Sequence, residues 1–160
     1  MTKFDDVFQE YEKEKMKRIA EENARAMEDA AEREEFSNSF LAAAAIIKPL
    51  FTEFATEARR HGFPSAVEDG SDQHGNPYLQ ARFFPERYVV TNTDTSRDCA
   101  FILMANLAER KVVADNRFHL WPEKNSTRNI TFTKRTLSKA TLTKLLYEFM
   151  RTALEARDEA

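Results

Sequence analysis

Cysteine, glycine and long apolar runs are scarce in this chain of 160 residues, and each scarcity excludes a class of structure. The single cysteine, Cys99, cannot form a disulfide within the chain, and its apolar neighbours in CAFILMA predict a buried structural thiol. No run approaches the roughly 18 apolar residues of a membrane-spanning helix, and the N-terminus lacks a basic segment followed by an apolar one. We therefore expect a soluble cytoplasmic protein without a membrane partner.

The three glycines, Gly62, Gly70 and Gly75, all fall where helical periodicity gives way to alternation. Two of them belong to the acidic stretch EDGSDQHGNPY, residues 68–78. This stretch lacks the Asp-x-Asp-x-Asp-Gly order of a calcium loop, and for zinc it offers His74 without a cysteine or a second histidine at helical spacing. We expect a hairpin connection there, and no cofactor or metal.

Charge is unevenly distributed along a chain whose 18.5 kDa suit one domain with its own core. Residues 1–35 hold seven Lys and Arg against twelve Asp and Glu, whereas residues 110–139 hold eight basic residues against two acidic ones. The 13 phenylalanines exceed what a disordered chain carries, so a globular body with a charged, solvated element is predicted.

The charged element is a predicted long amphipathic helix, because residues 4–36 contain neither Gly nor Pro. Acid-first pairs such as Glu14 with Arg18 and Glu21 with Arg25 support it. A parallel coiled coil is not predicted, since a heptad through Phe4, Val7 and Tyr11 brings charged residues into the seam. The small residues in the second half of the stripe suit an antiparallel pair. The apolar stripe, with one five-residue jump, comprises Phe4, Phe8, Tyr11, Met16, Ala20, Ala24, Met27 and Ala31.

A second helix is predicted from Ser37 or Ser39, as N-cap, to about His61. Pro49 lacks a backbone donor and predicts a kink near Ile46 to Lys48 or a restart. Gly62 is the expected stop signal, and His61 is interpreted as a group that complements the helix dipole rather than as a catalytic base.

Five strands and a last helix follow. Segment 99–107 is apolar on both alternating sets and predicts a central strand covered on both faces. The C-terminal helix should begin at a Ser138 cap and end near Arg157. The expected fold is α+β, with a long N-terminal helix, a kinked second helix, an antiparallel meander of four to five strands and an amphipathic C-terminal helix, divided into residues 1–36 and 37–160. The predicted strands are 65–69, 78–84, 99–107, 111–121 and 129–134.

One surface of the predicted sheet has a basic, aromatic character. If Phe118 and Leu120 point inward, then Arg117, His119 and Trp121 share the outward face. Sheet platforms that bind nucleic acid combine basic and aromatic residues in this way. A solvated strand face is the simpler interpretation, and the pI of about 5.7 argues against a dedicated nucleic-acid binder. Arg135 and Arg82 are expected beside this face.

These patterns favour a small cytoplasmic adaptor-like or chaperone-like protein that binds other proteins, forms a homodimer and has no catalytic activity. The alternative is a nucleic-acid or anion-binding module that uses the basic sheet face, and the third is an enzyme whose site no motif reveals. The order of helix, sheet and helix is similar in a general way to secretion chaperones, without a shared motif. The candidate partner-binding residues are Phe4, Phe8, Tyr11, Met16, Arg117, His119, Trp121 and Arg135.

Overall fold

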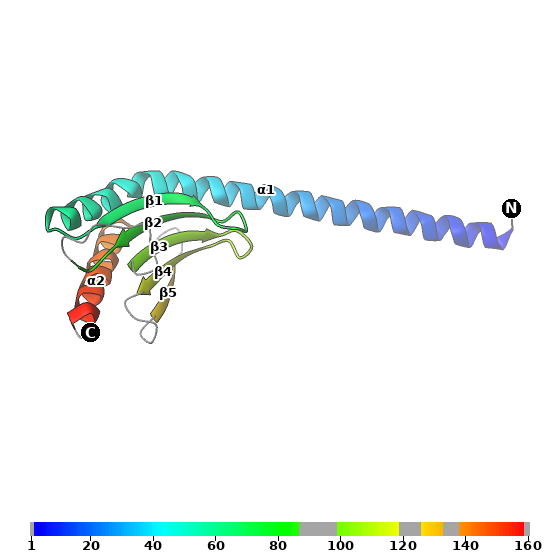
Figure 1. The fold of residues 1–160 in the computed structure, drawn as a ribbon. Helices are drawn as coiled ribbons and strands as arrows, with labels where there is room; N and C mark the ends of the chain where they lie inside the picture. Colours follow the sequence, from blue (N-terminus) through cyan, green and yellow to red (C-terminus); the bar gives the residue numbers. More distant parts are fainter. Residues whose placement is uncertain (1, 87–98, 119–125, 133–137, 159–160) are drawn as a thin grey trace. The chain divides into compact units, whose positions relative to one another are not determined.

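The computed structural model describes residues 2–86, 99–118, 126–132 and 138–158, and its helix and strand content confirms the α+β class (Figure 1). Contacts between residues divide the chain into two units, Met1–Phe36 and Ser37–Ala160. The elements are α1 (Lys3–Arg60), β1 (Ser65–Ser71), β2 (Pro77–Phe83), β3 (Cys99–Asn106), β4 (Lys111–Phe118), β5 (Ser126–Phe132) and α2 (Lys139–Asp158).

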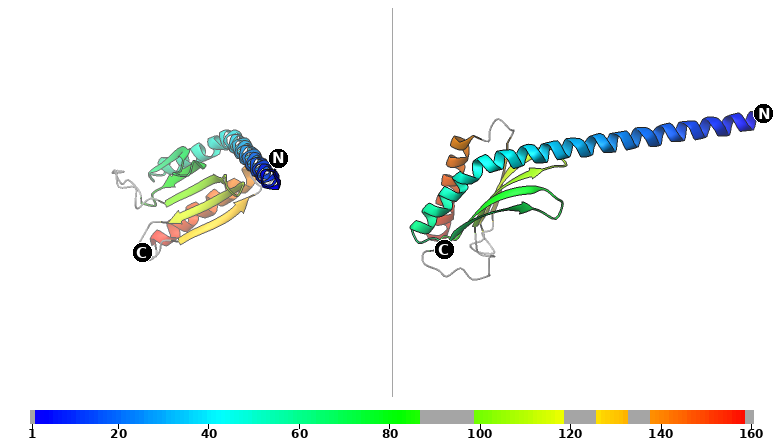
Figure 2. Two further views of the ribbon diagram at one scale, coloured as in Figure 1. Left: turned by 90° about the vertical axis from the view of Figure 1, so that its right-hand side faces the viewer. Right: turned by 90° about the horizontal axis from the view of Figure 1, so that it is seen from above.

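The prediction of a separate second helix is wrong, because α1 is one helix of 58 residues that passes through Ser37 and Ser39 without a break. No glycine or proline precedes Pro49, and the alanines at 42–45 are the strongest helix formers, so the local sequence gives no reason to stop. Pro49 lies inside the helix, where it offers no N–H to the carbonyl of Ala45. Figure 2 shows a change of direction in the cyan-to-green part of α1, the stretch that holds this proline.

Gly62 ends α1, as the sequence predicts. Its φ of 90° is in the left-handed region, which favours glycine. The N–H of Phe63 donates to the carbonyl of Ala58 at 2.9 Å, and the N–H of Gly62 donates to that of Arg59 at 3.0 Å. This pair of bonds is a Schellman arrangement, which satisfies the last helix carbonyls and turns the chain toward β1.

The five strands form one antiparallel sheet in the order β1-β2-β3-β4-β5, so the predicted meander is confirmed. The stretch 68–78 connects β1 to β2 as a hairpin, with Ser71 opposite Pro77. Ser138 caps α2, since its Oγ accepts the N–H of Thr141 at 3.1 Å. The beginning of the C-terminal helix was therefore predictable from its cap.

The core lies on one face of the sheet, where both α2 and the second-unit part of α1 pack. The ring of Phe149 on α2 lies 5.6 Å from that of Phe118 and 5.9 Å from that of Phe101, centroid to centroid. Phe51 on α1 also meets Phe101, at 5.9 Å. Side chains of this kind on α1 and α2 interdigitate with the buried alternate residues of the strands. The buried residues of β2, β3 and β4 are Pro77, Leu79, Ala81, Phe83, Cys99, Phe101, Leu103, Ala105, Val112, Ala114, Asn116 and Phe118.

Among the described residues, helices from the second unit cover β3 on one face, and the cover expected on its other face is not shown. The burial of β3 alternates, with Phe101 and Leu103 fully buried and Ile102 and Met104 only half-buried. Phe51 of α1 and Phe149 of α2 both pack against Phe101, so these two helices cover the Phe101 side of the strand.

Candidate interaction surfaces

The N-terminal unit exposes large apolar side chains. The exposed fraction of the side chain is 76% for Phe4, 67% for Phe8 and 58% for Tyr11. This unit is a single helical stretch, so it has no second element of its own on which an apolar face could pack. Each such side chain leaves about 1.5–3 kcal/mol of burial free energy unrealised in water. The unit therefore presents an unpartnered apolar surface.

The predicted stripe of this helix divides into two patches. Each residue of an α-helix advances by about 100°, so the five-residue step from Tyr11 to Met16 rotates the stripe by roughly 140°. Because α1 continues through this step without interruption, Met16 and Met27 lie on a different face from Phe4 and Tyr11. We name Phe4, Val7, Phe8 and Tyr11 the N-terminal patch; all four are exposed.

The hairpin loop between β1 and β2 is built around the carboxylate of Asp72. Its Oδ1 accepts the backbone N–H of His74 and that of Asn76, both at 2.8 Å. The hydrogen bond from the Asn76 backbone is the main cause that lowers the pKa of Asp72 below its usual value. Gly75 adopts a φ of 78° in the same turn. Asp72 and Gly75 thus serve the turn, whereas Glu68, Asp69 and Gly70 belong to β1.

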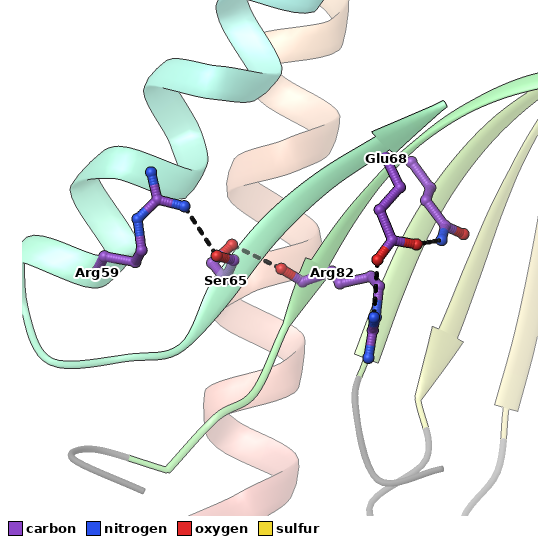
Figure 3. Close-up of polar contacts among 5 residues, drawn as sticks. Arg59, Ser65, Glu68 and Arg82 are labelled. Carbon is purple, nitrogen blue, oxygen red and sulfur yellow. Dashed lines mark hydrogen bonds and ion pairs between the residues drawn. The ribbon is translucent and has the colours of Figure 1, made fainter. Parts of the chain in front are cut away.

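A polar network occupies the outer face of β1 and β2 (Figure 3). The Glu68 carboxylate accepts Nη1 of Arg82 at 2.8 Å and Nε2 of Gln80 at 2.7 Å. The hydrogen bond from Arg82 is the largest cause that lowers the pKa of Glu68. On this side of the sheet, the arginine charge is therefore directed at a carboxylate within the same face.

A second set of contacts joins the end of α1 to the start of the sheet, also seen in Figure 3. Nη1 of Arg59 donates to the carbonyl of Ser65 at 2.9 Å, and the Ser65 hydroxyl donates to the carbonyl of Arg82 at 2.6 Å. Arg59 thus reaches the adjacent strand and does more than complement the helix dipole. His61 is exposed, with its Nε2 3.9 Å from a Glu57 carboxylate oxygen.

The basic sheet face is only partly visible in the described residues. Arg117 lies on the outer face of β4, and its Nε is 3.1 Å from Oδ2 of Asp115. His119, Trp121 and Arg135 lie outside the described residues. The structure therefore does not test whether these four predicted residues lie together, and the nucleic-acid alternative stays a prediction.

Sequence reasoning missed two unpartnered oxygens on β4. Oδ1 of Asp115 and Oδ1 of Asn116 are buried and accept no hydrogen bond from the described residues. Asp115 belongs to the outer face and Asn116 to the core face. In the sequence, the only signal for them is the run of polar residues in the strand KVVADNRF. They show that β4 carries polar side chains on both of its faces.

A small hollow lies beside α1 and α2. It has a volume of about 170 Å³, below the roughly 300–1,000 Å³ of typical ligand pockets. Its lining residues are Ile46, Ile47, Pro49, Leu50, Glu53 and Lys139. Within the described ranges, no three His, Cys, Asp or Glu side chains cluster in a way that could hold a metal ion. Cys99 is fully buried.

By length and composition, α1 is the one helix in the described part of the chain that could cross a membrane. This is weak support for a span, because core helices of globular proteins pass the same test. The apolar side chains of α1 that are buried in the second unit are Phe40, Ile47, Phe51, Ala55 and Ala58. Their burial shows that this apolar stretch packs in the core of the second unit.

Comparison of the chain with protein-family models, with curated proteins and with solved structures gave no match. The functional interpretation therefore rests on the surfaces described above.

Proposed function

We propose that this is a small adaptor-like or chaperone-like protein of the cytoplasm that acts by binding protein, without catalysis, and that the helix of residues 3–36 is its binding element. The observation that carries the proposal is the N-terminal patch, whose Phe4 is 76% and Phe8 67% exposed. Apolar side chains of this size on an isolated helix are commonly buried when a protein partner binds, as in helix-in-groove recognition.

Charged residues further along the same helix support this proposal. An isolated helix of this length is stabilised in water by intrahelical ion pairs, such as Arg33 with Asp29 at 2.9 Å. The helix can therefore exist before it meets a partner. Binding then needs little ordering of the backbone, and the free energy gained from burying the patch is not consumed by folding.

A photo-crosslinking amino acid tests this function. It replaces Phe8 in one variant and Glu10 in a matched control, two positions on opposite sides of the helix by the 100° rotation per residue. We expect defined protein adducts, identified by mass spectrometry, from position 8 and few from position 10 when the protein is irradiated in its host cells. Equal or absent adducts at both positions would contradict a binding role for the patch.

A further inference from the structure

The face that bears Phe4, Phe8 and Tyr11 continues along the helix as a row of charged residues. From Tyr11, alternating steps of four and three residues follow one side of an α-helix, the spacing of a two-helix seam. The row ends at Phe36, which closes the unit. We name this row the seam; it comprises Tyr11, Lys15, Arg18, Glu22, Arg25, Asp29, Glu32 and Phe36.

Six consecutive seam residues are charged, and the order of their signs is not random. From residue 15 to residue 32 the signs run plus, plus, minus, plus, minus, minus. If this row is read backwards and every sign is inverted, the same row results. Such a row is complementary to itself in the antiparallel direction, whereas a parallel copy in register meets it with like charges at every position.

A parallel pair in register would place each residue beside its own copy. Lys15 would meet Lys15 and Glu22 would meet Glu22, and the same holds at all six charged positions. Like charges at facing positions destabilise helix pairs. The seam therefore opposes parallel self-association.

An antiparallel pair can match every seam charge. When Glu22 faces Arg25 of the other copy, Arg18 faces Asp29 and Lys15 faces Glu32. The two-fold axis repeats each of these pairs, so six unlike pairs form. At each end Tyr11 meets Phe36, which gives the charged centre an aromatic contact on both sides. Asp29 already pairs with Arg33 in its own helix, and a carboxylate has acceptor sites for a second arginine.

The neighbouring antiparallel registers contain conflicts. A shift by one heptad in one direction brings Lys15 opposite Arg25, and a shift in the other direction brings Glu22 opposite Glu32. Unpaired or repelling charges at seam positions are a common way for coiled coils to specify register. The charges thus select one alignment among those that the helix geometry allows.

Beside the seam, the residues on one flank make favourable contacts in the selected register, and those on the other flank repel each other. In the selected register Glu12 faces Arg33, and Ile19 faces Ala26. The opposite flank carries a row of glutamates that face one another in the selected register, and this repulsion weakens the pair. This row is Glu14, Glu21, Glu28 and Glu35.

We propose that the partner of the N-terminal helix is a second copy of this chain, bound as an antiparallel helix pair over Tyr11–Phe36 with Glu22 of each copy opposite Arg25 of the other. The inference rests on the proposed function, since it names the partner of the same binding element. Most seam residues are exposed in a single copy, so the contact surface exists before association.

Charge exchange between two variants tests the pairing. The first variant carries Lys15→Glu and Arg18→Glu, and the second carries Asp29→Arg and Glu32→Lys. Each alone converts four of the six unlike pairs into like pairs, whereas a mixture of the two restores unlike charges in all six pairs of the heterodimer. Single exposed pairs are weak, but four change sign together, so we expect each variant alone to raise the dimer dissociation constant by about thirtyfold or more.

Sedimentation of the full-length proteins measures this effect. We expect a dimer for the natural chain at tens of micromolar, monomers for each variant alone and recovery of a dimer on mixing. A loss of helix stability caused by the substitutions would persist in the mixture, so recovery separates pairing from folding. The matched control, Lys13→Glu with Lys17→Glu, makes the same change in net charge away from the seam and should leave the dimer intact.

Thiol crosslinking tests the register. A chain with Ile19→Cys is mixed with a tagged chain with Ala26→Cys, and a short bifunctional thiol reagent is added; the natural chain, whose Cys99 is buried, is the background. We expect covalent dimers from the mixture and few from Ile19→Cys with Glu12→Cys, a pair that the selected register separates.

Two results would overturn the inference. One is a monomeric natural chain at tens of micromolar, and the other is a dimer that tolerates both charge variants separately. Neither result removes the proposed function if position 8 crosslinks to a different protein in the host cells. Failure of the self-pairing and failure of the binding role are therefore distinguishable.

Discussion

Arg82 and Glu68 form an ion pair across β2 and β1, with 2.8 Å between Nη1 and Oε1, although they do not face each other in the strand register. Glu68 is opposite Gln80, and Arg82 is opposite Ala66. The ion pair is therefore a diagonal one, and the Glu68 carboxylate also accepts the amide of Gln80 that lies directly across. One carboxylate in this way joins two neighbouring residues of β2 to the edge strand.

Loss of this carboxylate charge should remove an acid-dependent part of the stability. The pKa of Glu68 is lowered in the folded chain, so its contribution is complete above the ordinary value of 4.5 and is lost as the pH falls through the folded value. Glu68→Gln should cost about 0.2–1 kcal/mol near pH 7, since the carboxylate is partly exposed. Urea unfolding from pH 7 to pH 3 should show a smaller acid loss for the variant than for the natural chain. Parallel pH profiles would contradict this role.

Phe149 should be the most costly aromatic ring of α2 to remove. It is 1% exposed and its ring lies within 6.4 Å, centroid to centroid, of the rings of Phe54, Phe83, Phe101 and Phe118. Phe149→Ala should lower the free energy of unfolding by about 3–5 kcal/mol because it removes the transfer free energy and leaves a cavity. Phe149→Leu, which fills most of the space, should cost less and keep the fold.

Tyr147 on the same helix is the matched control. It is 58% exposed, so Tyr147→Ala should change the free energy of unfolding by no more than about 0.5 kcal/mol. Similar losses for Tyr147→Ala and Phe149→Ala would mean that α2 does not pack through the face described here.

The hairpin loop should weaken when Asp72 loses its carboxylate. Asp72→Ala leaves the N–H groups of His74 and Asn76 without their acceptor and should lower the melting temperature, whereas His74→Ala keeps the backbone N–H and should not. The lowered pKa of Asp72 means that this contribution is present above about 3.8 and disappears as the pH falls below it. Melting temperatures near pH 7 and pH 3 test both statements; a variant that differs from the natural chain only at pH 3 would contradict the sign.

Much of the fold was predictable because its signals are local. Gly62 marks the end of α1 through a left-handed φ, and Ser138 marks the start of α2 through a side-chain hydrogen bond. The alternation of Leu79, Ala81 and Phe83 identifies a face of β2 without knowledge of its neighbours. Such signals depend on a few adjacent residues, so a sequence alone contains them.

The errors arise where the outcome depends on the absence of a stop or on distant packing. Ser37 and Ser39 are residue types that favour helix N-caps. Such a residue does not by itself end a preceding helix, and α1 continues through both positions. Ile102 and Met104 suggested a second covering layer, whereas the helices that pack on β3 lie on its opposite face and these two residues are half-buried. The contact of Glu68 with Arg82 was equally hidden, because the register that brings them together is a property of the whole sheet.

Removal of residues 2–36 should separate association from folding. The buried hydrophobic residues, from Phe40 to Ala153, all belong to the second unit, so the shortened chain keeps its core. Its helix would begin near Ser37 or Ser39, and either hydroxyl can then cap the new first turn. We expect cooperative urea unfolding with a midpoint close to that of the natural chain at low protein concentration, and a monomer by light scattering at tens of micromolar. A shortened chain that unfolds without cooperativity would show that the N-terminal helix stabilises the second unit, and one that still dimerises would place the self-contact on the sheet or on α2.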